Sequence, residues 1–309
     1  MPSLKSLKIR ISSVQSTRKI TKAMQLVAAS RLRHAKDSVA GARIYATKMQ
    51  EIFHTLAASI TPSEWPEFIT SHVTPDRVSD FCSKAHLVVL ITSERGLCGG
   101  LNSATTKSTI ETIRNHQSAG SDIKILTVGC KGLEHLKREH KNLLFDHVDL
   151  SGIKSICITQ AFEIASKIMN LYREGIFGTC SLHYGRFRTV LEQISTTDQI
   201  FPVILPEDLS AILRGTTSSD TASSNSVFFS EPNGAVALEE MLFDYCVSRI
   251  FLGLTEHAAS EQGARMTAMD AATRNAGDMI DKLTLVYNRQ RQTNITGELI
   301  EIISGAEAL

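Results

Sequence analysis

The stretch LKSLKIRISSVQSTRKITKAMQLVAASRLRHA, from Leu4 to Ala35, decides the fold, because its apolar residues recur at alternating intervals of three and four. The same spacing continues to Leu56 and makes one seam, which we call the N-terminal seam. Its members are Leu4, Leu7, Ile11, Val14, Arg18, Thr21, Gln25, Ala28, Leu32, Ala35, Val39, Ala42, Ala46, Met49, Phe53 and Leu56. We therefore predict one long helix. At about 1.5 Å per residue it would exceed about 75 Å, so it must project from any compact domain.

The C-terminal end of the chain offers a partner for this helix. No proline occurs from about residue 234 to residue 309, and a second seam repeats the intervals of three and four. Its members are Met269, Ala272, Ala276, Met279, Leu283 and Val286. Alanine is frequent in both seams, which favours close packing of the two helices into a thin, stiff rod. Glycines interrupt the C-terminal helix, and each costs about 1 kcal/mol relative to alanine, so we expect partner contacts to compensate. They include Gly253, Gly263, Gly277 and Gly297.

The residues between the two predicted helices have a different pattern. Residues 61–84 hold three prolines and indicate an irregular connection. Short apolar runs then alternate with helical patterns over residues 85–213, which predicts a small α/β domain with right-handed crossovers. Residues 214–233 form a Ser/Thr-rich loop with too little apolar content to pack. The two long helices are thus predicted at 1–60 and 234–309.

Composition restricts the class of protein. With 309 residues, of which 42% are hydrophobic and 21% charged, the chain is long enough for a sizeable folded core. No apolar run is long enough to span a bilayer, and the N-terminus lacks the apolar core of a secretory signal. Any membrane association is therefore expected to be peripheral. The six cysteines are scattered along the chain and are expected to be reduced thiols.

Charge is distributed unevenly along the chain. Residues 1–58 contain eleven lysines and arginines against only Asp37 and Glu51, whereas the formal net charge of the whole chain is +1. Such a basic segment favours an acidic partner, which could be nucleic acid, anionic lipid or an acidic protein surface. A basic coiled-coil protein that binds nucleic acid is therefore one hypothesis for function.

The loop ITSERGLCGGLNS, from Ile91 to Ser103, raises the question of phosphate binding, because it lies between a predicted strand and a predicted helix. It lacks the lysine of a P-loop, and Gly96, Gly99 and Gly100 do not have the intervals of a dinucleotide fingerprint. We interpret these glycines as a tight turn that lets the following helix pack on the sheet. An enzyme that binds phosphate at this loop remains an alternative.

Other catalytic or metal-binding patterns are also lacking in the sequence. The ten histidines show neither H-x-x-x-H nor H-E-x-x-H spacing, and Cys98 has no histidine near it in the sequence. We therefore predict no catalytic residue, no metal site and no cofactor.

Several motifs carry a resemblance to a known family. KITKAMQLVAASRLRHA, from Lys19 to Ala35, resembles a segment of the γ subunit of the F-type ATP synthase, the central rotor stalk of that enzyme. LVYNRQRQTNIT and SERGLCGGLN are similar to further motifs of the family. ITGELIEIISGAEAL, at the C-terminus, resembles the signature of the family through Ile295, Thr296, Glu298, Glu301, Gly305 and Ala306.

The resemblance implies a fold and a set of partners. The N- and C-terminal helices would form a long antiparallel coiled coil, with a small Rossmann-like α/β domain as a foot. The coiled coil would stand inside a ring of three α and three β subunits, while the foot would sit with the ε subunit on the membrane's ring of c subunits. Proton flow would turn this rotor and drive the β sites through ATP synthesis or hydrolysis. The chain itself would need no nucleic acid and no small-molecule substrate.

The resemblance also implies which residues contact the β subunits. Arg291 and Gln292 match a pair that meets an acidic loop of β, where a planar guanidinium can bridge carboxylates bidentately. Lys22 and Met24 match the opposing contacts on the N-terminal helix. Arg18 belongs to the polar interruption of the N-terminal seam, where the family's helix meets the β subunits.

The compartment follows only indirectly from the sequence. The N-terminal seam begins three residues after Met1, which leaves no room for an Arg- and Ser-rich transit peptide. We therefore expect a bacterial chain, peripheral on the cytoplasmic face of the plasma membrane, rather than a mitochondrial one.

Overall fold

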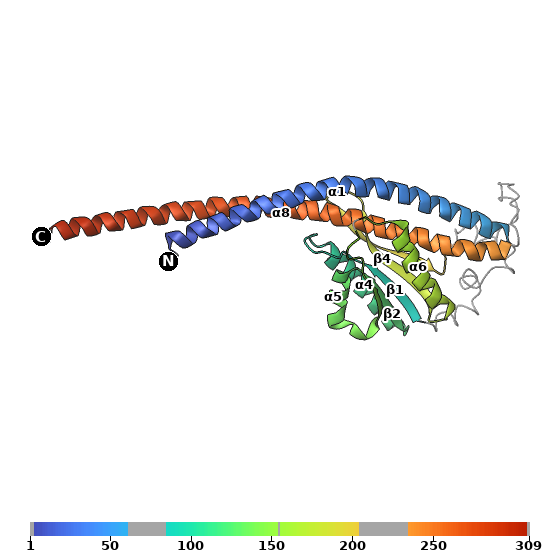
Figure 1. The fold of residues 1–309 in the computed structure, drawn as a ribbon. Helices are drawn as coiled ribbons and strands as arrows, with labels where there is room; N and C mark the ends of the chain where they lie inside the picture. Colours follow the sequence, from blue (N-terminus) through green and yellow to red (C-terminus); the bar gives the residue numbers. More distant parts are fainter. Residues whose placement is uncertain (1–2, 61–84, 154, 204–233, 308–309) are drawn as a thin grey trace, which may run out of the picture. The chain divides into compact units, whose positions relative to one another are not determined.

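The computed structural model describes residues 3–60, 85–153, 155–203 and 234–307. Two helices dominate it, α1 (Leu4–Ser59) and α8 (Gly234–Glu307). The chain divides into two compact units, which we call the helical unit and the sheet unit. The helical unit comprises residues 1–31 with 265–309, and the sheet unit comprises residues 32–264. Each unit contains a part of both long helices, which are labelled in Figure 1.

The helical unit is an antiparallel pair made of the first half of α1 and the last part of α8. Thr21 Oγ1 lies 2.8 Å from Thr273 Oγ1, and Gln25 Nε2 donates to Asp270 Oδ1 at 2.8 Å. The residue number of the partner on α8 falls as the residue number on α1 rises, so the two helices run in opposite directions. Thr21 and Gln25, two polar members of the N-terminal seam, thus hydrogen-bond across the helix pair, which the sequence pattern alone did not reveal.

The N-terminal seam is the inward side of α1. Every member of it is buried or half-buried except Arg18, which is exposed. Burial is deepest at positions such as Leu32, Ala42 and Phe53, which are at most 4% exposed. The predicted long helix and its seam are therefore confirmed.

The predicted C-terminal seam is only partly right. Met269 and Ala276 are buried, but Met279 and Val286 are each 49% exposed. A run of buried or half-buried positions spaced by four and three continues from Met269 through Thr273, Ala276, Ile280, Leu283, Tyr287 and Gln290. The predicted seam takes the two intervals in the opposite order, so Met279 and Val286 each fall one residue short of the inward position.

In the part of the sheet unit that the structure describes, five strands and three shorter α-helices lie between the long helices. The strands are β1 (Ala85–Ile91), β2 (Ile123–Val128), β3 (Leu144–Val148), β4 (Phe177–Phe187) and β5 (Gln193–Phe201). The helices are α4 (Leu101–Ser118), α5 (Cys130–Glu139) and α6 (Ile158–Arg173), with a short 3₁₀ turn, η2 (Lys141–Leu143), before β3. The sheet order is β3-β2-β1-β4-β5. The first four strands are parallel, and β5 is antiparallel to β4. The predicted α/β fold is confirmed.

Helices cover both faces of the sheet. On one face, α4 and α5 pack against β1 and β2 through a cluster that includes Val88, Ile113 and Leu136. On the other face, α6 and the sheet-unit parts of α1 and α8 close a larger core that includes Phe53 and Ile250. All seven residues of β1 are buried, as expected for a central parallel strand covered on both sides.

A polar layer lies on β1 and β4 beneath α4. His86 Nε2 is 2.8 Å from Ser181 Oγ, and Ser181 Oγ is 3.1 Å from His183 Nε2. The ring of His116, on α4, stacks on that of His86 with centroids 4.0 Å apart. Burial, together with the neighbouring histidines, lowers the pKa of His86 to about 3, and burial lowers that of His183 to about 4. These side chains are therefore neutral at ordinary pH.

Candidate functional site

The residues predicted to contact β subunits all lie in the helical unit. Arg18 and Lys22 are exposed, and Lys22 Nζ donates to Gln25 Oε1 at 3.0 Å. Met24 is half-buried. Arg291 and Gln292 are both exposed on α8, and neither side chain makes a hydrogen bond or ion pair with another residue that the structure describes. All except Met24 are thus available for contact with another molecule.

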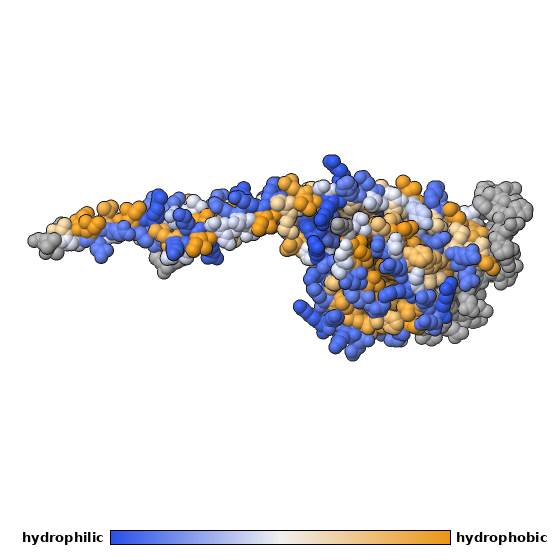
Figure 2. Space-filling view, viewed as in Figure 1, coloured by the Kyte–Doolittle hydropathy of each residue, from blue (hydrophilic) through white to orange (hydrophobic). Residues whose placement is uncertain are grey.

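The C-terminal part of α8 displays apolar side chains to solvent. Residues 291–306 are exposed throughout, although they include Ile295, Leu299, Ile302 and Ile303, which are 48% to 67% exposed. Figure 2 shows apolar surface along this part of the helix. Clustered exposed apolar side chains of this kind mark a surface that another chain covers.

The glycine loop after β1 belongs to the sheet unit. Gly99 has a φ of 59°, in the left-handed region that favours glycine, and Leu97 shares that region at 65°. A Cβ at Gly96 or Gly100 would meet no atom within 4 Å, so these two glycines do not mark a close approach between helix and sheet. Close approach occurs instead at Gly129, where a Cβ would lie 2.1 Å from the backbone oxygen of Thr92.

The crevice in which this loop could bind a ligand is filled by α8. The carboxyl ends of β1 and β4 form a topological switch point, where open α/β sheets bind ligands. Here Ala264 of α8 packs in a buried cluster with Cys98 and Leu101. A Cβ on Gly185, near the end of β4, would lie 2.7 Å from Leu101 and 3.4 Å from His257 of α8. This packing disfavours the hypothesis of a phosphate-binding enzyme.

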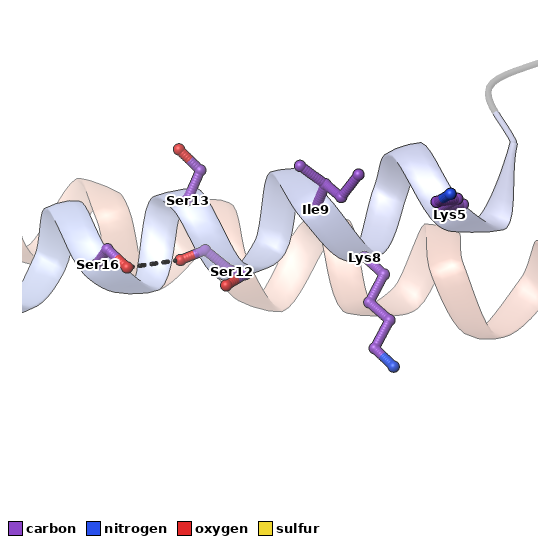
Figure 3. A pocket seen from close by; sticks show the side chains of 6 residues that line it. All are labelled: Lys5, Lys8, Ile9, Ser12, Ser13 and Ser16. Carbon is purple, nitrogen blue, oxygen red and sulfur yellow. Dashed lines mark hydrogen bonds between the residues drawn. The ribbon is translucent and has the colours of Figure 1, made fainter.

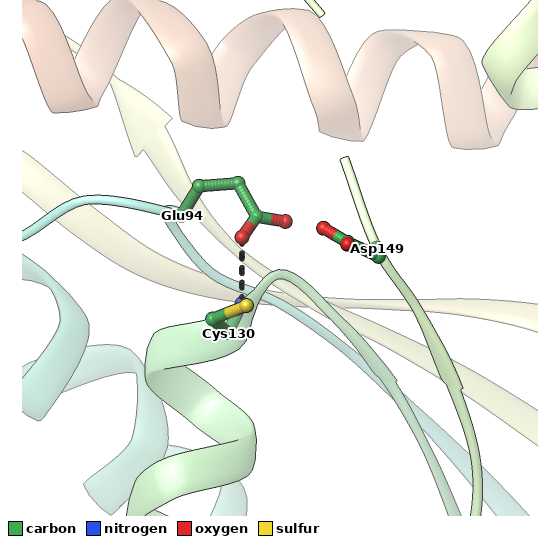
Figure 4. A group of neighbouring side chains, drawn as sticks. All are labelled: Glu94, Cys130 and Asp149. Atoms are coloured by element: carbon green, nitrogen blue, oxygen red, sulfur yellow. Dashed lines mark hydrogen bonds between the residues drawn. The ribbon is translucent and has the colours of Figure 1, made fainter. Parts of the chain in front are cut away.

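Three potential metal ligands meet at the same edge of the sheet. Their ligand atoms, from Glu94, Cys130 and Asp149, lie within 4.8 Å of one another (Figure 4). Glu94 accepts hydrogen bonds from the backbone N–H groups of Cys130 (3.2 Å) and Leu150 (2.8 Å). A side-chain hydrogen bond to Glu94 raises the pKa of the Cys130 thiol to about 11, so the thiol is protonated at neutral pH. The two hydrogen bonds to Glu94 tie together the segments that follow β1, β2 and β3.

A shallow groove runs along the exposed side of α1 in the helical unit. It is lined by Lys5, Lys8, Ile9, Ser12, Ser13 and Ser16 (Figure 3). All six residues lie on one helix, and the hydroxyl of Ser16 is bonded to the carbonyl oxygen of Ser12 at 3.1 Å. The groove is thus the space between neighbouring surface side chains.

The fold and these surfaces define the class of protein. An antiparallel pair of long helices, an α/β sheet whose crevice is filled, and an exposed apolar helix end are typical of a subunit that assembles with other chains. Comparison with known proteins identifies the family. A family model described as ATP synthase matches residues 3–309. The chain belongs to the family of ATP synthase gamma chains.

Similar proteins share both the sequence and the fold. The chain is 46% identical to the ATP synthase gamma chain of Paracoccus denitrificans (strain Pd 1222) and 42% identical to that of Brucella abortus (strain S19), over the whole of each chain. Its fold resembles a chain of the Tetrahymena thermophila mitochondrial ATP synthase central stalk and c-ring structure, with a TM-score of 0.58 and 24% identity over 82% of this chain and 99% of that one. A chain of the Euglena gracilis mitochondrial ATP synthase (OSCP, F1 and c-ring, rotational state 3) gives 0.67 and 18%, over 99% and 94%.

Proposed function

We propose that this chain is the rotating central-stalk subunit of an F-type ATP synthase. It couples proton flow through the membrane c-ring to ATP synthesis or hydrolysis at the three β subunits. The observation that carries this proposal is the match to ATP synthase gamma chains over the entire length of both proteins. The hypothesis of a nucleic-acid-binding protein is not favoured, because it leaves this match unexplained.

The partners of the chain are three α and three β subunits, the ε subunit and the c-ring. The exposed apolar end of α8 suits the interior of a ring of subunits, because burial there would remove its isoleucines and leucines from water. The basic residues of α1 suit acidic surfaces of the same ring. The chain acts as a mechanical element and supplies no catalytic residue of its own.

Arg291 and Gln292 contact an acidic loop of a β subunit in this proposal. Both side chains are exposed, so they can be presented to a new β subunit at each rotational position. Lys22, Met24 and Arg18 provide the opposing contacts from α1. Arginine suits this role because its fork of N–H donors binds carboxylates bidentately and can release them without a change in protonation.

The chain is peripheral on the cytoplasmic face of a bacterial plasma membrane in this proposal. The bacterial relatives support that location. Among the described residues, no helix is long and apolar enough to cross a membrane.

Native mass spectrometry of the tagged chain, isolated from its own cells, tests the proposed function. We expect one copy of the chain with three α and three β subunits. Recovery of the chain alone or with nucleic acid would contradict the proposal.

A further inference from the structure

The last residues of β4 extend beyond their parallel neighbour. β4 has 11 residues and β1 has 7, and the pairing of the two strands ends at Leu90 with His183. On its other side β4 continues to pair with β5 as far as Phe187. The backbone groups of Gly185 and Phe187 that face away from β5 therefore need partners other than a strand, because unpaired buried backbone groups are costly.

Side chains of α8 provide these partners at Gly185. The N–H of Gly185 donates to His257 Nδ1 at 3.2 Å, and the carbonyl oxygen of Gly185 accepts from Ser260 Oγ at 2.9 Å. Burial lowers the pKa of His257 to about 4, so its ring is neutral and Nδ1 can accept a hydrogen bond. The backbone of β4 is thus bound to α8 in the way a further strand would bind it.

At Phe187 the same role is taken by an ion pair. The N–H of Phe187 donates to Glu256 Oε2 at 2.9 Å, and its carbonyl oxygen accepts from Arg43 Nη2 at 2.8 Å. Arg43 Nε also donates to Glu256 Oε1 at 2.6 Å. Arg43 lies on α1 and Glu256 on α8, so one cluster joins both long helices to the end of β4. All three residues belong to the sheet unit.

Glu256 is the centre of this cluster. Its side chain is 2% exposed, whereas that of Arg43 is 44% exposed. A buried carboxylate is costly unless it is paired and hydrogen-bonded, and here both oxygens have partners. Removing Arg43 would leave the buried Glu256 carboxylate without its counter-charge. Glu256 and Arg43 therefore couple α1, α8 and the end of β4, because breaking the contact of one segment also destabilises the contacts of the others.

We propose that Glu256 is the positioning residue of a joint, formed with Arg43 and the end of β4, through which torque passes between the sheet and the two long helices. This inference rests on the proposed function as a rotor. Apolar packing is non-directional, whereas hydrogen bonds weaken steeply when they are misaligned. Bonds from both long helices to one strand end therefore fix the rotational position of the helices against the sheet.

The test compares Glu256→Gln with Glu240→Gln, a matched change at an exposed glutamate of the same helix. Glutamine keeps the size of the side chain but replaces one carboxylate oxygen with an NH2 donor. Because Arg43 Nε and the Phe187 N–H bind different oxygens of Glu256, one of these two donors then faces another donor. Arg43→Lys is a second variant. It keeps the positive charge but lacks the guanidinium that donates to both Glu256 and the carbonyl oxygen of Phe187.

The first measurement is hydrogen exchange on the full-length chain. We expect amide exchange at Phe187 to accelerate about tenfold or more in Glu256→Gln, because a hydrogen bond to a charged group is lost. Exchange should accelerate less in Arg43→Lys and stay unchanged in Glu240→Gln. Unchanged exchange at Phe187 in both joint variants would overturn the joint itself.

The second measurement is proton pumping per ATP hydrolysed in inverted membrane vesicles that carry the whole ATP synthase. We expect this ratio to fall in Glu256→Gln, since ATP hydrolysis would continue while the sheet no longer follows the rotation of the two long helices. A purely structural defect would lower hydrolysis and pumping in proportion, and a ratio equal to that of Glu240→Gln would overturn the role in torque. If the wild-type chain itself supports no coupled pumping, the proposed function fails, and the inference fails with it.

Discussion

Replacing Gly253 with alanine should destabilise the sheet unit, whereas the same change at Gly277 should stabilise the helical unit. Both glycines lie in α8, and alanine improves helix propensity by about 1 kcal/mol at either position. At Gly253, however, a Cβ would lie 2.7 Å from Leu182 Cδ2 and 3.3 Å from Ile91 Cδ1. Leu182 is fully buried, so it cannot move aside without disturbing the core. Overpacking of this kind costs about 1–3 kcal/mol, which leaves a net destabilisation of up to about 2 kcal/mol.

At Gly277 the nearest atom to a new Cβ would be Arg18 Cζ at 3.9 Å, an ordinary contact. The gain in propensity should therefore be retained there. Peptide-resolved hydrogen exchange on the full-length chain measures both effects locally. We expect exchange around residue 253 to accelerate by up to about 30-fold in Gly253→Ala, and exchange around residue 277 to slow by about fivefold in Gly277→Ala. Slower exchange in both variants would refute the reasoning, because it would mean that the core accommodates the methyl group.

Three further predictions concern contact, protonation and thiol reactivity. Arg291→Ala with Gln292→Ala should lower ATP turnover of the assembled enzyme and leave the fold intact. Arg289→Ala, at an exposed arginine on the side of α8 opposite Arg291, should leave ATP turnover unchanged. Equal turnover in all variants would remove the contact assignment. The pKa of His86 falls from 6.5 to about 3 on folding, so below pH 6.5 the unfolded chain gains a proton that the folded chain does not, and stability is lost. His86→Gln should make the slope of unfolding free energy against pH shallower by up to about 1.4 kcal/mol per pH unit in urea titrations, and an unchanged slope would contradict the assignment. Cys130, whose pKa is about 11, should be alkylated by iodoacetamide more slowly than an unperturbed thiol. Equal alkylation rates measured by mass spectrometry would argue against the hydrogen bond between the Cys130 thiol and the Glu94 carboxylate.

The sequence predicted the long helices because their signal is local and repeated. Each heptad of the N-terminal seam repeats the same information, so single polar members such as Arg18 do not obscure it. The outward positions Met279 and Val286 were assigned wrongly because the intervals of three and four can start in either order, and the sequence pattern does not decide between them. The strand β3 gives little signal in the sequence, because it is short and only partly buried.

The sequence could not reveal contacts that depend on the packing of distant segments. Glu256 stands in an apolar part of α8, and that charge was the one available signal of a buried pair. Its partners, Arg43 and Phe187, are distant in the sequence, and no spacing rule connects them. The sequence likewise does not reveal that α8 fills the crevice beside the glycine loop, because this depends on how α8 packs on the sheet. The residues assigned to β contact came from family resemblance, because an exposed arginine carries no partner information by itself.

The most direct test of the central claim is observation of rotation. Cys157 is exposed, and it offers an attachment point for a gold particle on a complex whose α and β subunits are fixed to glass. We predict that ATP drives stepwise, unidirectional rotation of the particle about a fixed axis. A particle that stays stationary or moves only by random diffusion, in complexes that hydrolyse ATP at the normal rate, would contradict the account of this chain as the rotor.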